Sequence, residues 1–91
     1  MNLERYEIEW TRQAIKDLKL LSQKPALLKN LERFLELISE NPYRYQFPFE
    51  ALMNDLQGTF SVRLNIQHRL WYTIEEESKT VVILRIWGHY G

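Results

Sequence analysis

The segment that most limits what this chain can fold into is TVVILRIW, residues 80–87, near the carboxyl end. It is an almost continuous apolar run, interrupted by a single arginine. Runs of this kind, in which polar and apolar residues do not alternate, are typical of a central strand that is covered on both faces. The run therefore predicts a sheet with residues 80–87 at its centre and with other elements packed above and below.

Three further segments have the alternating pattern of strands that are buried on one face. Near the amino end, in RYEIEW, the apolar set Tyr6, Ile8 and Trp10 alternates with glutamates. After Gly58 the apolar set is Phe60, Val62, Leu64 and Ile66, and Ser61, Arg63 and Asn65 face the other way. A tight turn near residues 65–67 leads into HRLWYTI, residues 68–74, and the charged turn EEESK, residues 75–79, precedes the apolar run.

Two helices are predicted between the first strand and the others. Thr11 is a suitable N-cap for a first helix, in which Ile15, Leu18 and Leu21 follow helical spacing. Another face of that helix carries Arg12, Lys16 and Lys19. A second helix is predicted to begin at Pro25 and to end at Asn41-Pro42. Its apolar stripe consists of Leu27, Leu28, Leu31, Phe34, Leu35 and Ile38.

This order of elements predicts an α+β fold for residues 1–91 as a single domain. The expected architecture is an N-terminal strand, an antiparallel two-helix hairpin, and a three-stranded antiparallel sheet packed on the helices. Residues 42–58 contain two prolines and have weak periodicity, and we expect an ordered but irregular connection there.

Composition narrows the function classes. The chain has no cysteine, which excludes disulfides, thiolate metal sites and cysteine nucleophiles and favours a reducing compartment. Twelve basic residues balance twelve acidic ones, so the chain has no overall basic field of the kind that nonspecific nucleic-acid binders carry. We expect neither a leader peptide nor a membrane span, and a cytoplasmic protein is the default. The two histidines and the scattered carboxylates form no pattern typical of a metal site, and we expect no cofactor.

What remains is a possible metal-free set of polar residues. Arg63 and Arg69 lie on either side of the predicted turn, so both guanidiniums are expected on the uncovered face of the sheet. A pair of solvated arginines is the simpler explanation, and phosphate binding is the functional one. Glu50 is either an ordinary loop carboxylate or a functional one. His89, two residues from the chain end, is likewise either an incidental histidine or one that takes part in chemistry. Together the four residue types are sufficient for cleavage of RNA, which carries its own 2′-hydroxyl nucleophile.

The segment FEALMNDLQGTFSVRLNIQHRLWY, residues 49–72, together with HY at residues 89–90, resembles the YoeB/Txe branch of the RelE/ParE superfamily of toxin-antitoxin toxins. The resemblance is carried by L-x-G at residues 56–58, H-R-L-x-Y at residues 68–72 and the terminal H-Y, at the intervals that the branch has. Met53 stands where the branch usually has lysine, and Ala51 where it has proline. Val62 replaces the first of two adjacent arginines, and Gly91 extends the usual terminus by one residue.

The resemblance implies a RelE-like fold and a ribosome-dependent endoribonuclease that cuts messenger RNA and is held inactive by a cognate antitoxin protein. Carried over by position, it implies that Glu50 is the general base, Arg69 the transition-state arginine, and Arg63 a phosphate-binding residue. It also implies that His89 is the general acid and Tyr90 a base-positioning aromatic residue. The implied partners are the antitoxin, the ribosome and messenger RNA, with a homodimer or a toxin-antitoxin hetero-oligomer as possible assemblies.

Two other hypotheses belong to different classes. The first is a noncatalytic toxin of the ParE type, which shares the fold and acts by binding DNA gyrase. The second is a catalytically decayed toxin that still folds and binds its antitoxin. The glutamate and the terminal histidine, which the ParE type generally lacks, favour the nuclease.

Overall fold

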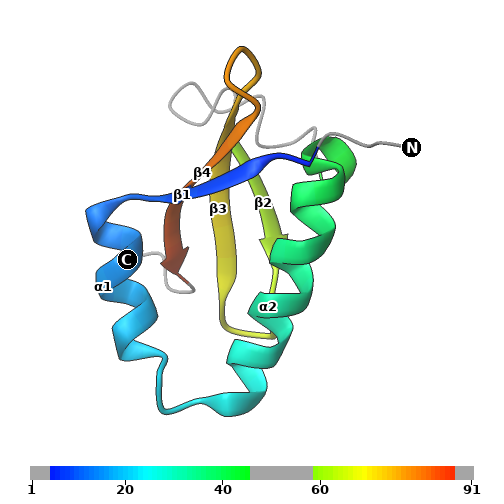
Figure 1. Cartoon of the computed structure of the whole chain (residues 1–91). Helices are drawn as coiled ribbons and strands as arrows, with labels where there is room; N and C mark the ends of the chain where they lie inside the picture. Colours follow the sequence, from blue (N-terminus) through cyan, green and yellow to red (C-terminus); the bar gives the residue numbers. More distant parts are fainter. Residues whose placement is uncertain (1–4, 46–58, 88–91) are drawn as a thin grey trace.

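The computed structural model describes residues 5–45 and 59–87 (Figure 1). Within these residues the elements follow in the predicted order. They are β1 (Glu7–Trp10), α1 (Arg12–Leu20), α2 (Pro25–Glu40), the 3-10 helix η1 (Pro42–Tyr45), β2 (Thr59–Arg63), β3 (Arg69–Glu75) and β4 (Thr80–Trp87). The predicted α+β class is therefore confirmed.

The strands form one four-stranded sheet in the order β1-β4-β3-β2. The pairs β2–β3 and β3–β4 are antiparallel, as predicted, and β4 lies centrally, as its apolar sequence predicted. The sheet has four strands where three were predicted, because β1 joins it parallel to β4, with Ile8 opposite Val81 and Trp10 opposite Ile83. A parallel partner is possible here because the chain between β1 and β4, which contains both helices as well as β2 and β3, is far longer than the crossover that parallel pairing requires.

The helices begin and end where their sequences predict. The side chain of Thr11 caps α1 by accepting a hydrogen bond from the Ala14 amide at 3.1 Å. In Figure 1 the helices run in opposite directions and are splayed apart from their connection. The interior-facing side of α1 was predicted in part wrongly: Ile15 is 43% exposed, whereas Ala14 and Asp17 are buried together with Leu21. In the described ranges neither helix is long and apolar enough to cross a membrane.

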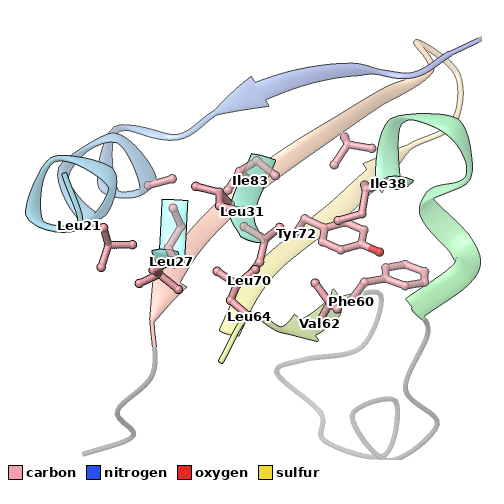
Figure 2. Packing of buried hydrophobic residues seen from close by; sticks show 13 residues of the cluster. Leu21, Leu27, Leu31, Ile38, Phe60, Val62, Leu64, Leu70, Tyr72 and Ile83 are labelled. Atoms are coloured by element: carbon pink, nitrogen blue, oxygen red, sulfur yellow. The ribbon is translucent and has the colours of Figure 1, made fainter. Parts of the chain in front are cut away.

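The core lies between one face of the sheet and the helices (Figure 2). Its centre is formed by fully buried residues of the sheet, which α2 covers with three buried side chains. These residues are Leu70, Tyr72, Val81 and Ile83 from the sheet and Leu27, Leu31 and Ile38 from α2. Val82, Leu84 and Arg85 of β4 are half-buried, so the second face of this strand is covered only in part.

The alternation after Gly58 ends earlier than predicted. Phe60, Val62 and Leu64 are buried, but Ile66 is 87% exposed. The side-chain oxygen of Asn65 accepts hydrogen bonds from the amides of Gln67 and His68, at 2.8 and 2.7 Å. These bonds form a turn that ends the strand pattern before residue 66, as is common for asparagine.

Candidate functional site

Arg63 and Arg69 lie directly opposite each other, at the last residue of β2 and the first of β3. Side chains of such a pair are on the same face of the sheet, with β-carbons about 4.5 to 5.5 Å apart. Their neighbours in sequence, Val62 and Leu70, are buried in the core, so the arginines project from the face away from the helices. The prediction that both arginines share one face of the sheet is confirmed, but Ser61 on that face is fully buried, so the face is not uncovered as expected. We call Ser61, Arg63, Arg69 and Trp71 the arginine face.

Neighbouring contacts hold the side chain of Arg69. Its Nε donates a hydrogen bond to Oγ of Ser61 at 2.9 Å, and its guanidinium carbon lies 5.9 Å from the centre of the Trp71 ring. Ser61 is fully buried, which makes its hydroxyl a rigid acceptor. Arg63 is exposed. The arginine face thus combines a guanidinium in a defined orientation with a second positive charge, an arrangement that favours an anion.

The structure shows the consequence of one departure from the family pattern, the valine at position 62. Its position corresponds to the first of the two adjacent arginines, and its side chain is 6% exposed and points into the core. A valine at this position therefore removes no charge from the arginine face, because successive residues of a strand point to opposite faces.

The residues on either side of segment 46–58 are joined through an aromatic stack. The hydroxyl of the fully buried Tyr72 donates a hydrogen bond to the carbonyl oxygen of Pro42 in η1 at 2.6 Å. The Phe60 ring of β2 stacks on Tyr72 at 5.4 Å and meets Tyr43 edge to face at 5.8 Å. The point where the chain enters this segment and the point where it leaves are therefore fixed to the same strand, β3.

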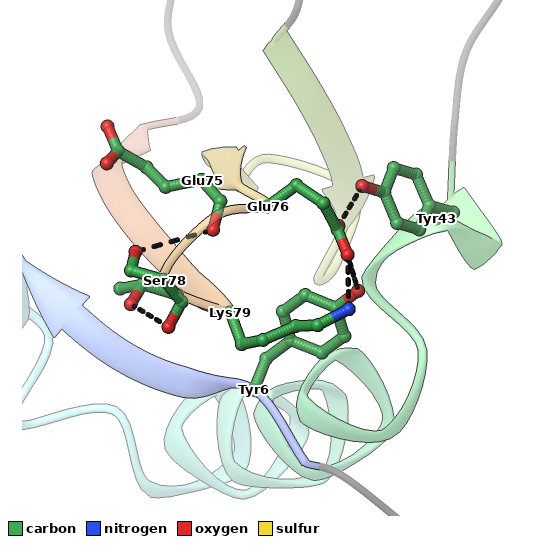
Figure 3. Close-up of polar contacts among 7 residues, drawn as sticks. Tyr6, Tyr43, Glu75, Glu76, Ser78 and Lys79 are labelled. Atoms are coloured by element: carbon green, nitrogen blue, oxygen red, sulfur yellow. Dashed lines mark hydrogen bonds and ion pairs between the residues drawn. The ribbon is translucent and has the colours of Figure 1, made fainter.

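A polar cluster supports η1 from its exposed side (Figure 3). The carboxylate of Glu76, in the turn between β3 and β4, accepts hydrogen bonds from the hydroxyls of Tyr6 and Tyr43 and forms an ion pair with Lys79. Hydrogen bonds to its carboxylate lower the pKa of Glu76 to about 2, with the largest effect from Lys79, followed by Tyr43 and Tyr6. Glu76 as an acceptor raises the pKa of Tyr43 to about 12. The cluster links the start of β1, η1 and the last turn of the sheet.

Three of the predicted catalytic residues, Glu50, His89 and Tyr90, lie outside the described residues. Their predicted convergence with the two arginines stays a prediction. His68 closes the turn between β2 and β3, where its carbonyl oxygen accepts a hydrogen bond from the Leu64 amide at 2.8 Å. In the described part of the chain no group of three or more histidine, cysteine, aspartate or glutamate side chains comes together as metal ligands would.

Two supporting residues were missed by sequence reasoning. Ser61 was expected only to face the polar side. Its hydrogen bond to Arg69 was not predicted, because alternation gives the face of a residue and not the partner that its side chain selects across the strands. Asp17 was not singled out, although it is 3% exposed and paired with Arg85 at 3.0 Å. A detectable pattern existed for this pair, since Asp17 is an acid within the buried face of a helix and Arg85 is a cation within an apolar strand.

Comparisons with known proteins agree with the fold. The family model described as the ParE toxin of type II toxin-antitoxin systems matches residues 8–90. The structure is similar to the RelBE2 toxin-antitoxin complex of Mycobacterium tuberculosis, with 35% identity and a TM-score of 0.75 over 97% of this chain and 95% of that one. It is also similar to the YoeB-YefM complex of Staphylococcus aureus, with 30% identity and a TM-score of 0.74 over 94% and 99%.

A third structure, the YoeB/ParE toxin from Agrobacterium tumefaciens, has a TM-score of 0.79 over 92% of this chain and 99% of that one, at 17% identity, and supports the fold alone. No curated protein matched by sequence. The fold and the family match define a toxin of a type II toxin-antitoxin system. The chain belongs to the ParE toxin family, in the YoeB-like branch of the RelE/ParE superfamily.

Proposed function

We propose that this protein is a ribosome-dependent endoribonuclease that cuts messenger RNA and thereby stops translation in the cytoplasm. The observation that carries the proposal is the direct pairing of Arg63 and Arg69 on one face of the sheet. Like charges directly opposite in a sheet are destabilising, and a bound phosphate relieves that repulsion. The orientation of Arg69 by Ser61 supports the same conclusion, since a fixed donor is most useful where charge develops during a reaction.

The proposed chemistry uses the nucleophile that RNA carries. Glu50 accepts the proton of the 2′-hydroxyl, and the O2′ atom attacks the adjacent phosphorus. Arg63 and Arg69 stabilise the negative charge that grows on the pentacoordinate phosphorus. As the bond from phosphorus to O5′ breaks, His89 donates a proton to the leaving oxygen, and Tyr90 positions the base. The products are a 2′,3′-cyclic phosphate and a 5′-hydroxyl, and neither a metal nor a cofactor takes part.

A cognate antitoxin is the proposed protein partner. The Mycobacterium tuberculosis and Staphylococcus aureus relatives were both solved as toxin-antitoxin complexes, and a YoeB dimer is also known from Staphylococcus aureus. An antitoxin segment that offers carboxylates to Arg63 and Arg69 would form charge-assisted hydrogen bonds with the same donors that the phosphate needs. The antitoxin would then inhibit by occupying the arginine face, in a hetero-oligomer or in competition with a homodimer.

The alternative is a noncatalytic ParE-type toxin that binds DNA gyrase. The family match to the ParE toxin model is compatible with this alternative. The sequence features that favour the nuclease are Glu50 and His89. A decayed toxin that only binds its antitoxin is the third hypothesis.

One experiment separates the three hypotheses. The purified toxin is added to ribosomes translating a defined messenger, the RNA ends are mapped, and gyrase supercoiling and binding of the cognate antitoxin are assayed in parallel. The proposal predicts new messenger ends on ribosomes, none on free messenger, and unchanged supercoiling. Loss of supercoiling without new ends would establish the gyrase-binding alternative, and antitoxin binding with neither effect would establish the decayed toxin.

A further inference from the structure

The outer edge of β4 changes partners halfway along the strand. Residues 80–83 pair with β1, which ends at Trp10 opposite Ile83. Thr11 extends the pairing, because its amide donates to the Ile83 carbonyl at 3.1 Å and its hydroxyl donates to the Leu84 carbonyl at 3.0 Å. On the other side of β4 the register with β3 shifts at Leu84, between the pairs Tyr72–Ile83 and Trp71–Arg85. The last part of β4 therefore needs a different support on its outer edge.

Asp17 of α1 provides that support. One carboxylate oxygen accepts a hydrogen bond from the Ile86 backbone amide at 2.9 Å and another from Nε of Arg85 at 3.1 Å. The second oxygen accepts from a terminal nitrogen of Arg85 at 3.0 Å and from the side chain of Gln13 at 3.3 Å. The carboxylate thus takes the place that a neighbouring strand would have, and it holds both the backbone and the side chain of β4.

The environment of Asp17 is suited to a permanent charge. Burial raises the pKa of Asp17, and the bonds from Arg85, the Ile86 amide and Gln13 outweigh burial, so that the net pKa is lowered. Because Asp17 is 3% exposed, water does not replace these bonds readily when one of them is removed. Arg85 also connects Asp17 with the arginine face. It lies opposite Trp71 in the sheet, and the ring of Trp71 lies beside the guanidinium of Arg69.

We propose that Asp17 is a positioning residue for catalysis: by holding Arg85 and the Ile86 amide, it fixes the end of β4, from which the chain continues within two residues to His89. The inference rests on the proposed function for its catalytic consequence. It assigns Asp17 no contact with RNA. A general acid must reach the leaving oxygen within about 2.6 to 3.2 Å, so a shift of the strand end by a fraction of that distance slows proton transfer.

The test is the Asp17→Asn variant of the full chain. The amide keeps the size of the side chain and one acceptor oxygen, but it loses the charge and the second acceptor. Glu36→Gln is the matched control, because Glu36 is an exposed carboxylate that is paired with Arg5 at 3.0 Å and lies on α2. Arg85→Lys is the second variant, since it keeps the charge and leaves the bond between Asp17 and the Ile86 amide in place.

Two readouts separate positioning from general destabilisation. The first readout is single-turnover cleavage measured at a series of ribosome concentrations. It gives two separate quantities, the cleavage rate at saturation and the ribosome concentration at which half of that rate is reached. The second is amide hydrogen exchange of Ile86 relative to residues 81–83, the central part of the same strand. Loss of fold would accelerate exchange at both places, whereas release of the strand end accelerates it at Ile86 alone.

For Asp17→Asn we expect a 10- to 100-fold lower saturating rate, a half-saturating concentration within twofold of the parental value, and exchange at Ile86 at least 10-fold faster relative to residues 81–83. Glu36→Gln should stay within twofold of the parental protein in every measurement. The values for Arg85→Lys should lie between those of Glu36→Gln and Asp17→Asn. A parental saturating rate in Asp17→Asn, or unchanged relative exchange at Ile86, would overturn the inference. If the parental protein cut no messenger, the proposed function would fail, and the exchange measurement would still decide whether Asp17 fixes the end of β4.

Discussion

The hydrogen bond from Tyr72 to Pro42 gives a stability prediction that the structure makes quantitative. Tyr72→Phe removes one hydroxyl from a fully buried ring and leaves the ring itself unchanged. The hydroxyl donates to the Pro42 carbonyl at 2.6 Å, and Pro42 is also fully buried. Loss of one partner of a buried hydrogen bond lowers the free energy of unfolding by about 1 to 2 kcal/mol. For a domain of this size that corresponds to a midpoint lower by about 5 to 15 °C.

The assay is urea unfolding followed by far-ultraviolet circular dichroism, together with a thermal melt. Tyr43→Phe is the matched control, because Tyr43 also contacts Phe60 but is 45% exposed, and its hydroxyl bonds to an exposed carboxylate. We expect the control to lose less than about 0.5 kcal/mol. Equal losses in the two variants, or a loss below about 0.3 kcal/mol in Tyr72→Phe, would refute the conclusion that this bond anchors η1 to β3.

Three further predictions concern catalysis, pH and inhibition. His89→Gln and Arg69→Lys should each cleave messenger on ribosomes at least about 100-fold more slowly in single-turnover assays, because each removes a donor that acts in the transition state. Arg69→Lys should also lower the free energy of unfolding by about 1 to 2 kcal/mol, since the buried Ser61 loses its bond; a parental cleavage rate in either variant would remove that residue from the mechanism. The pKa of Glu76 is lowered to about 2 in the folded state, so its stabilising contribution is complete above its ordinary value of 4.5 and is lost as pH falls toward 2. Urea unfolding of Glu76→Gln should therefore depend less on pH across that range than unfolding of the parental protein, and identical slopes would contradict the role of the cluster. Added cognate antitoxin should abolish cleavage at a one-to-one ratio of toxin to antitoxin, and a complex that retained full activity on ribosomes would exclude the arginine face as the inhibited surface.

The parts of the fold that were predictable from sequence follow from local patterns. The apolar run of β4 predicted its central place, and the alternation around Arg63 and Arg69 predicted their shared face, because a short turn leaves few choices of register. The parallel pairing of β1 with β4 was not predictable in this way. Alternation identifies a strand and its buried face but does not identify its neighbour.

The Asp17–Arg85 pair illustrates a different limit. The two residues are 68 positions apart, and neither the helical spacing of α1 nor the apolar run of β4 contains information about their contact. Each residue is nevertheless unusual in its own segment, because a charge on a buried face needs a partner. An acid in one buried segment and a cation in another are together a useful indication of a contact that periodicity alone misses.

In the proposed mechanism RNA supplies the nucleophile, and this protein supplies the acid, the base and the two arginines. The most direct measurement is cleavage of a ribosome-bound messenger in which the nucleotide 5′ to the mapped cut carries a single 2′-deoxy substitution. We expect the unsubstituted messenger to be cut to a 2′,3′-cyclic phosphate and a 5′-hydroxyl, and the 2′-deoxy messenger not to be cut at that position. Cleavage of the 2′-deoxy messenger at the rate of the unsubstituted one would show that the nucleophile is not the 2′-hydroxyl and would contradict the proposed mechanism.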